Sequence, residues 1–262
     1  MRRLVESAGL QPGDMVLEVG GGTGALTELI AGQVANLICI EIDRDLHSIL
    51  MDRLGAIPGV TLVLGDILES KHRLLPAVGQ RLPEWESTTR GSCKLVANLP
   101  YQIAASLLMN LLIDYPAVRR LCFTVQAEVG ERITAPPGCK DFGPLSIVIQ
   151  ALCDVEILAR LGPQAFWPQP EVDSVMIRMD VVRSPFADRS DVRRFADLVR
   201  GTFDHRRKTL RSALGYVLEV EALERVCQRL DATRRPESFA VQEWIEVFHF
   251  ATGVDPPPRG TR

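Results

Sequence analysis

The sequence predicts an α/β fold, in which a parallel sheet carries helices on both faces and a small helical domain follows it. Over the first two-thirds of the chain, short runs of β-branched residues alternate with amphipathic stretches, which is the pattern of βαβ units. Strand-like runs then stop, and a break at Arg183-Ser184-Pro185 precedes segments with helical spacing only. We therefore expect a first domain over residues 1–183, a helical domain over 184–252 and a disordered tail over 253–262.

Seven short apolar runs between turn signals are expected to form strands. They are residues 15–19, 37–42, 61–64, 94–97, 120–125, 147–151 and 174–179. Apolar residues spaced by three and four predict helices at 26–30, 46–54 and 104–112. The segment from Glu69 to Ser92 is rich in charge, Pro and Gly, so it predicts a surface loop with a short helix at 73–78.

Composition limits the class of protein. The 262 residues are 46% hydrophobic and 24% charged, enough for one full-sized core with a smaller addition. The formal net charge of −3 argues against binding nucleic acid over the whole surface, because neutralising phosphates requires clustered cations. The chain has no apolar run of roughly eighteen residues and its start does not resemble a signal peptide, so we expect a cytoplasmic protein without membrane contact. Six scattered cysteines favour buried thiols over disulfides, and no metal is expected.

The sharpest local feature is the segment VLEVGGGTGALT, a strand that ends in glycines and opens directly into a helix. Gly20, Gly22 and Gly24 let the backbone pass close to a ligand, and the helix N-terminus supplies free N–H donors. Glu18 precedes the first glycine by two positions and no phosphate-binding Lys follows, which departs from a dinucleotide fingerprint. We infer a zwitterionic cofactor whose amino group lies near Glu18.

Acidic residues follow the next two strands. Glu41 stands about twenty residues beyond the glycines, where a ribose-binding acid belongs in nucleotide folds, a position that suits NAD and S-adenosylmethionine equally. Asp66 follows the third strand and is placed to accept from an adenine amine, with Ile42 and Ile67 as apolar walls. Each acid alone is more simply a surface residue or a helix cap. Because the ends of three strands all carry residues that suit a nucleotide, together they favour a nucleotide-like cofactor.

The fourth strand runs into Asn98-Leu99-Pro100-Tyr101, a turn whose residues indicate the class of reaction. An adenine amine is a poor nucleophile because its lone pair is delocalised into the ring. The Asn98 side-chain oxygen and the Leu99 carbonyl are placed to accept its two N–H groups, which would turn the lone pair toward a methyl donor. Pro100 stiffens the turn and Tyr101 would stack on the extruded base. Phe166 is the candidate for the opposite face, although such aromatics are more often core.

One local cluster of cations fits an RNA contact. It comprises Arg206, Arg207, Lys208 and Arg211, with only Asp204 opposing it. Taken alone, the cluster is equally well a solvated helix face.

Together these motifs resemble the ribosomal RNA adenine dimethyltransferase family, and the match spans nearly the whole chain. The stretches QAEV at 126–129 and FGPLS at 142–146 are similar to the bacterial small-subunit, kasugamycin-sensitivity branch. The resemblance implies a Rossmann-like class I methyltransferase sheet and the cofactor S-adenosylmethionine. It also implies that Gly20, Glu41, Asp66 and Asn98 bind the cofactor.

The resemblance further implies N6,N6-dimethylation of two adjacent adenosines in a hairpin near the 3′ end of small-subunit rRNA, within a pre-ribosomal particle. Nothing in the sequence indicates an obligate dimer, so we expect a monomer. Three features depart from the family pattern. The family carries a Gln-(Asn/His)-Phe-Leu segment that falls upstream of this Met1, Gln102 stands where Asn is usual, and the loop from Glu69 to Ser92 is long. Either translation starts upstream of this Met1, or the cofactor pocket is left without one wall.

Three alternatives remain open. A large-subunit rRNA adenine methyltransferase of the macrolide-resistance type would use nearly the same site residues. An assembly factor could bind the subunit through the basic cluster with little catalysis. An NAD-dependent oxidoreductase fits the glycines and Glu41, but it leaves Asn98 to Tyr101 unexplained and no proton relay is evident.

Overall fold

The computed structural model describes residues 1–70, 73–82, 91–166, 168–182 and 184–253. The chain forms two compact units, each built from two stretches of sequence. The first comprises Met1–Gly130 and Asp154–Val181, and the second comprises Glu131–Cys153 together with residues from Val182 onward. The helical unit therefore also contains a segment that the sequence assigned to the first domain. The predicted disordered tail lies outside the described residues except for Gly253, which ends the last helix.

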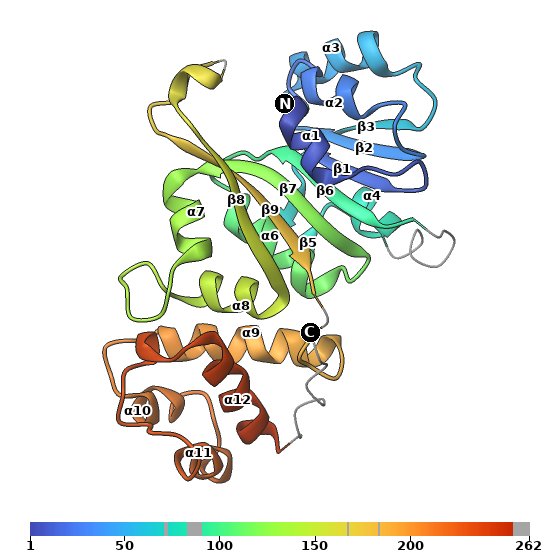
Figure 1. The fold of residues 1–262 in the computed structure, drawn as a ribbon. Coiled ribbons are helices and arrows are strands. Elements are labelled where there is room, and N and C mark those ends of the chain that lie inside the picture. The colour runs from blue at the N-terminus through green and yellow to red at the C-terminus, as the bar shows by residue number, and fades with distance from the viewer. Residues whose placement is uncertain (71–72, 83–90, 167, 183, 254–262) are drawn as a thin grey trace. The chain divides into compact units, whose positions relative to one another are not determined.

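The described residues of the first unit are built around a seven-stranded sheet in the order β3-β2-β1-β6-β7-β9-β8 (Figure 1). The strands are β1 (Met15–Val19), β2 (Asn36–Glu41), β3 (Val60–Leu64), β6 (Cys93–Asn98), β7 (Val118–Gln126), β8 (Cys153–Leu161) and β9 (Ser174–Val181). The strands from β3 to β7 pair in parallel, and β9 pairs antiparallel with β7. The α/β fold class predicted from the alternating pattern is confirmed.

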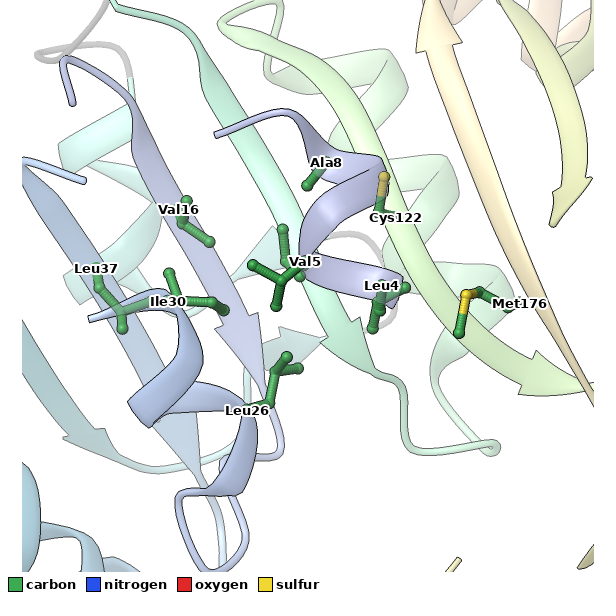
Figure 2. Close-up of a cluster of buried hydrophobic side chains, with 10 residues drawn as sticks. Leu4, Val5, Ala8, Val16, Leu26, Ile30, Leu37, Cys122 and Met176 are labelled. Atoms are coloured by element: carbon green, nitrogen blue, oxygen red, sulfur yellow. The ribbon is translucent and has the colours of Figure 1, made fainter. Parts of the chain in front are cut away.

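Helices that adjoin these strands in the sequence include α1 (Arg2–Ala8), α2 (Ala25–Ile30), α3 (Arg44–Leu54), α6 (Ala104–Asp114) and α7 (Ala127–Thr134). Three of them connect parallel strands of the sheet (α2, α3 and α6), whereas α1 precedes β1 and α7 follows β7. Side chains of α1 and α2, including Leu4 and Ile30, pack with Val16 of β1 and Leu37 of β2 in one buried cluster (Figure 2). Burial of side chains of this size contributes roughly 1.5–3 kcal/mol each. Leu17 alternates to the opposite face and is also buried, so both faces are covered.

The strand predicted at 147–151 is wrong, because these residues belong to helix α8 (Pro144–Leu152). Pro144 occupies the first turn, where its missing N–H has no intrahelical partner to lose. The helix is buried on nearly every side, so its sequence is apolar except for Ser146 and Gln150 and lacks the polar face that marks a surface helix. Strand β8, which follows it at once, was not predicted; charged residues interrupt its apolar pattern.

The segment after β3 also differs from the prediction. It forms a small antiparallel pair of β4 (Leu68–Ser70) and β5 (Arg73–Leu74), followed by α4 (Pro76–Gly79), where a helix over 73–78 was expected. Much of the remaining predicted loop, residues 71–72 and 83–90, lies outside the described part of the chain.

The second unit is helical after residue 182. It contains α9 (Arg189–Phe203), α10 (Leu210–Leu214), α11 (Val220–Cys227) and α12 (Val241–Thr252), in addition to α8. The side chain of Asp188 caps α9 by accepting from the Asp191 N–H at 3.1 Å. Phe186, Phe195 and Phe248 form an aromatic core with ring centroids 4.6 to 5.9 Å apart. No described helix in the chain is long and apolar enough to cross a membrane.

Candidate cofactor and substrate site

A cavity of about 430 Å³ opens in the first unit at the carboxyl ends of the parallel strands. The chain runs from β1 outward to β2 and β3, then returns to β6 on the other side of β1. Such a reversal leaves a crevice at the strand ends, which is where open α/β sheets bind ligands. The cavity is lined by Val19, Gly20, Ile40, Glu41, Ile42, Gly65, Asp66, Ile67, Pro100, Tyr101, Gln102 and Ile103.

The glycine loop after β1 takes backbone conformations that favour glycine. Gly20, Gly22 and Gly24 have φ values of +80°, +56° and +91°. The Gly20 N–H donates to the Ile40 carbonyl at 2.8 Å, which ties the loop to β2. A Cβ added at Gly20 would lie 3.5 Å from Pro100 Cγ, in the space between the loop and the turn after β6. Glycine therefore keeps this part of the cavity wall open.

Glu41 at the end of β2 is 5% exposed and supports the loop. Its Oε2 accepts from the Gly22 N–H at 2.8 Å and its Oε1 accepts from the Asp43 N–H at 3.0 Å. Each carboxylate oxygen can accept more than one hydrogen bond, so the group retains acceptor capacity toward the cavity that it lines. The arrangement fixes an acidic acceptor at the cavity floor.

The opposite wall combines an acid with apolar side chains. Asp66 is exposed, and its Oδ1 accepts from the Leu68 N–H at 2.9 Å, which fixes the carboxylate beside the cavity. Ile67 is buried, whereas Ile42 is 66% exposed. An isoleucine this exposed at a cavity edge provides apolar surface that a bound ring can cover.

Glu18 lies away from the cavity. Its side chain is completely buried within the first unit, beside Thr27 and Cys39. Burial, reinforced by the charge of Glu41, raises the pKa of Glu18 to about 8. The carboxyl group is therefore mostly protonated at neutral pH.

The turn after β6 is held by two hydroxyl groups from neighbouring strands. The Thr124 hydroxyl on β7 donates to Asn98 Oδ1, and the Leu99 N–H donates to the Thr124 carbonyl at 3.1 Å. The Tyr101 hydroxyl lies 3.0 Å from the hydroxyl of Ser174, a buried residue that begins β9. The amide and the aromatic ring are thus both fixed from outside the turn.

Thr124 and Ser174 were not predicted as site residues. A signal for Thr124 does exist, because a hydroxyl within an apolar strand needs a hydrogen-bond partner when it is buried. The identity of that partner depends on the pairing of β6 with β7, in which Asn98 faces Thr124.

The structure brings most of the predicted cofactor and base-binding residues together. Gly20, Glu41, Ile42, Asp66, Ile67, Pro100 and Tyr101 line the one cavity, and Asn98 and Leu99 directly precede Pro100. Among the described residues, the predicted site residues that the lining does not include are Glu18, Gly22, Gly24, Asn98, Leu99 and Phe166. Phe166 is half-buried and follows the 3-10 turn Pro163–Ala165, and its neighbour Trp167 lies outside the described residues.

The basic cluster belongs to the second unit. Arg207, Lys208 and Arg211 are exposed, whereas Arg206 is half-buried and donates to the Lys140 carbonyl at 3.3 and 3.4 Å. Lys208 also donates to the Tyr216 hydroxyl. Arg207 and Arg211 are therefore exposed to a charged partner, whereas Arg206 contributes to the local fold. Over the described residues, no group of His, Cys, Asp or Glu is arranged to hold a metal ion.

Comparison with known sequences identifies relatives along the whole described chain. A model of the family described as ribosomal RNA adenine dimethylase matches residues 1–252. Ribosomal RNA small subunit methyltransferase A of Alkaliphilus oremlandii is 35% identical over 249 residues, which cover 92% of this chain and 83% of the relative. The protein of the same name from Pseudomonas aeruginosa is 36% identical over 247 residues, covering 94% and 87%.

Solved structures share the fold. A dimethyladenosine transferase from Plasmodium falciparum aligns with a TM-score of 0.74 and 23% identity over 94% of this chain and 92% of that chain. The 23S rRNA methyltransferase ErmE aligns with a TM-score of 0.68 and 21% identity over 95% and 96%. Given the family match over residues 1–252, the relatives more than 30% identical and the sheet with its cavity, the chain belongs to the ribosomal RNA adenine dimethylase family of methyltransferase enzymes.

Proposed function

We propose that the protein uses S-adenosylmethionine to dimethylate the N6 amines of two adjacent adenosines in a hairpin near the 3′ end of small-subunit rRNA, during subunit assembly. The observation that carries this proposal is the turn from Asn98 to Tyr101, fixed by Thr124 and Ser174 at the edge of a cavity that also contains Glu41 and Asp66. The names of the relatives, which specify the small subunit, support the choice of rRNA.

The residues of the cavity suit a nucleoside-bearing cofactor. Glu41 accepts from the two ribose hydroxyls, and Asp66 accepts from the adenine amine. Ile42 and Ile67 would provide the apolar walls for the adenine ring, and Gly20 would let the amino-acid end pass close to the backbone. When bound, S-adenosylmethionine supplies an electrophilic methyl group on its sulfonium sulfur. We assign no cofactor contact to Glu18, which is not among the residues that line the cavity.

The substrate adenine is activated by acceptors on the turn. Asn98 Oδ1 and the Leu99 carbonyl accept the two N6 hydrogens, so the lone pair of the amine turns toward the methyl donor. An amide oxygen has two lone pairs, and Thr124 uses one of them, which leaves the second for the substrate. Tyr101 stacks on the extruded base, and its bond to Ser174 holds the ring in place.

The test is methyl transfer to a defined particle. The purified protein is incubated with labelled S-adenosylmethionine and undermethylated small ribosomal subunits, and the modified nucleosides are identified by mass spectrometry. We expect dimethyladenosine in the small-subunit rRNA. Transfer to large-subunit rRNA instead would favour the macrolide-resistance type of enzyme, and tight subunit binding without transfer would favour an assembly factor.

An Asn98→Ala variant tests the role of Asn98 in the chemistry. It should bind S-adenosylmethionine nearly as the wild type does, because Glu41 and Asp66 are unchanged. Its turnover should fall by about a hundredfold or more, the effect typical of removing one oriented polar group. Wild-type turnover in this variant would rule out the assignment of Asn98.

A further inference from the structure

An aromatic pair of half-buried His205 and exposed Tyr216 lies beside the basic cluster of the second unit. The rings of His205 and Tyr216 are stacked, with centroids 3.8 Å apart and an interplanar angle of 23°. Lys208 Nζ lies 4.6 Å from the Tyr216 ring centroid and donates to the Tyr216 hydroxyl. Tyr216 nevertheless remains 58% exposed. The pair therefore presents an aromatic surface that is partly exposed to solvent, next to the Lys208 cation.

The local fold holds this surface in place. The Thr209 side chain caps α10 by accepting from the Ser212 N–H at 3.3 Å. The start of the helix is tied to the following chain, since the Leu210 N–H donates to the Arg234 carbonyl at 2.7 Å. Leu210 and Leu214 are buried, so the inner side of the helix is fixed. Tyr216 follows the helix and stacks on His205, which precedes it. A ring surface that is already ordered loses little conformational entropy on binding.

The charges around the pair indicate its partner. Lys208 adjoins the rings, and Arg207 and Arg211 are exposed nearby in the chain. The whole protein has a formal net charge of −3, so the cluster is a local positive patch on an acidic protein. Single-stranded nucleic acid combines phosphates, which bind cations, with bases, which stack on aromatic side chains. RNA loops and bulges present such unstacked bases, whereas paired helices do not.

We propose that His205 and Tyr216, with Lys208, form a stacking site for an unpaired base of rRNA, while Arg207 and Arg211 contact the flanking phosphates. This inference rests on the proposed function for the identity of the RNA. It adds a base contact in the second unit to the phosphate contacts expected from the cations alone. The site holds the substrate RNA at a point outside the methyl-transfer cavity.

The test separates stacking from charge. Binding of undermethylated small ribosomal subunits is measured over a series of salt concentrations for the wild type, Tyr216→Phe, Tyr216→Leu and Arg207→Ala. Tyr216→Leu should weaken binding by about 5- to 150-fold, the range for one base stacked on an aromatic ring. Its plot of log affinity against log salt should keep the wild-type slope, because no phosphate contact is lost.

The other variants should behave differently from Tyr216→Leu. Tyr216→Phe keeps the ring and should bind within about threefold of the wild type, a loss smaller than that of one neutral hydrogen bond. Arg207→Ala should lower the salt slope by about one. Val220→Ala, at a side chain of the same unit that is 65% exposed, controls for general surface effects. Irradiation at short ultraviolet wavelengths should crosslink the RNA to the peptide that contains Tyr216, a readout that needs no variant to fold.

The outcomes are distinguishable. Wild-type affinity in Tyr216→Leu, or a crosslink map without the Tyr216 peptide, would overturn the stacking site and leave the proposed function intact. A reduced salt slope in Tyr216→Leu would also overturn it, since the ring would then act only by orienting Lys208. Failure of the wild type both to bind the subunits and to methylate them would remove the proposed function and the stacking site together.

Discussion

One hydroxyl group determines the orientation of the side chain assigned to substrate activation. Thr124 donates from its side chain to Asn98 and accepts through its carbonyl from Leu99. Both acceptors proposed for the adenine amine are therefore positioned by the same residue. Thr124 itself lies on β7 and touches the reaction only through the turn, so it is a positioning residue.

Replacing Thr124 by Val should lower kcat while leaving the KM for S-adenosylmethionine nearly unchanged. Valine keeps the branched shape but cannot orient the Asn98 amide, and a misplaced group can lower the rate by up to about a hundredfold. Thr124→Ser should restore most of the rate because it keeps the hydroxyl. Steady-state kinetics of the three proteins checks this. Equal kcat values in the Val and Ser variants would mean that the hydroxyl has no orienting role.

Glu18 should make stability depend on pH. Its pKa rises from 4.5 to about 8 on folding, so between these values the folded state keeps a proton that the unfolded state has released. Stability is therefore lost as pH rises from about 5 to 8, by up to about 1.4 kcal/mol per pH unit. Glu18→Gln stays neutral at every pH and should lack this slope.

The measurement for Glu18 is urea unfolding of both proteins at several pH values. Other titrating groups are common to the two proteins, so they cancel in the difference between the two free energies of unfolding. Parallel curves from pH 5 to 8 would show that Glu18 is ionised in the folded protein.

At the scale of single elements, the glycine loop needs glycine for two reasons: its backbone has positive φ angles, and it lies close to the cavity. Gly20 and Gly32 have nearly the same φ, +80° and +81°, but only Gly20 lines the cavity. A Cβ at Gly32 would meet nothing within 4 Å. The two positions therefore form a matched pair in which backbone strain is the same and the proximity to the cavity differs.

Gly20→Ala and Gly32→Ala should each lose about 1–2 kcal/mol of stability, because an L-residue is strained in the left-handed region. Only Gly20→Ala should also weaken the binding of S-adenosylmethionine, by about tenfold or more, since its methyl group enters the cavity beside Pro100. Thermal denaturation and calorimetric titration measure the two effects. Equal affinities in both variants would show that the ligand does not approach Gly20.

Helices and strands could be predicted from the sequence where their apolar residues recur regularly or where turn residues mark their ends. Elements without either signal could not. The strands that end in Glu41 and Asn98 are bounded by turn residues and were predicted within one residue at each end. Helix α8 was misassigned because burial on all sides removes the polar face that marks a helix. Strand β8 was missed because its side chains are mostly exposed or half-buried.

At the scale of the whole molecule, the sequence could predict those site residues that stand at the ends of strands. Parallel strands bring their carboxyl ends to one edge, so Glu41, Asp66 and Asn98 were expected together, and Glu41 and Asp66 line one cavity that the turn after Asn98 completes. The contacts that tune the site depend on which strands are neighbours. Ser174 reaches Tyr101 because β9 inserts antiparallel beside β7, and local sequence patterns carry no record of that pairing.

The interleaving of the two units has a consequence for the way the chain is made. Helix α8 ends at Leu152, and two elements that pack against it within the second unit are α9, from Arg189, and α12, from Val241. During synthesis from the N-terminus, the apolar surface of α8 emerges well before either partner exists. A nascent chain halted at Val181 would hold every strand of the sheet yet expose this helix, which makes it a natural target for chaperones and proteases. The α8 surface that α9 and α12 cover is therefore buried only once these C-terminal helices have been made.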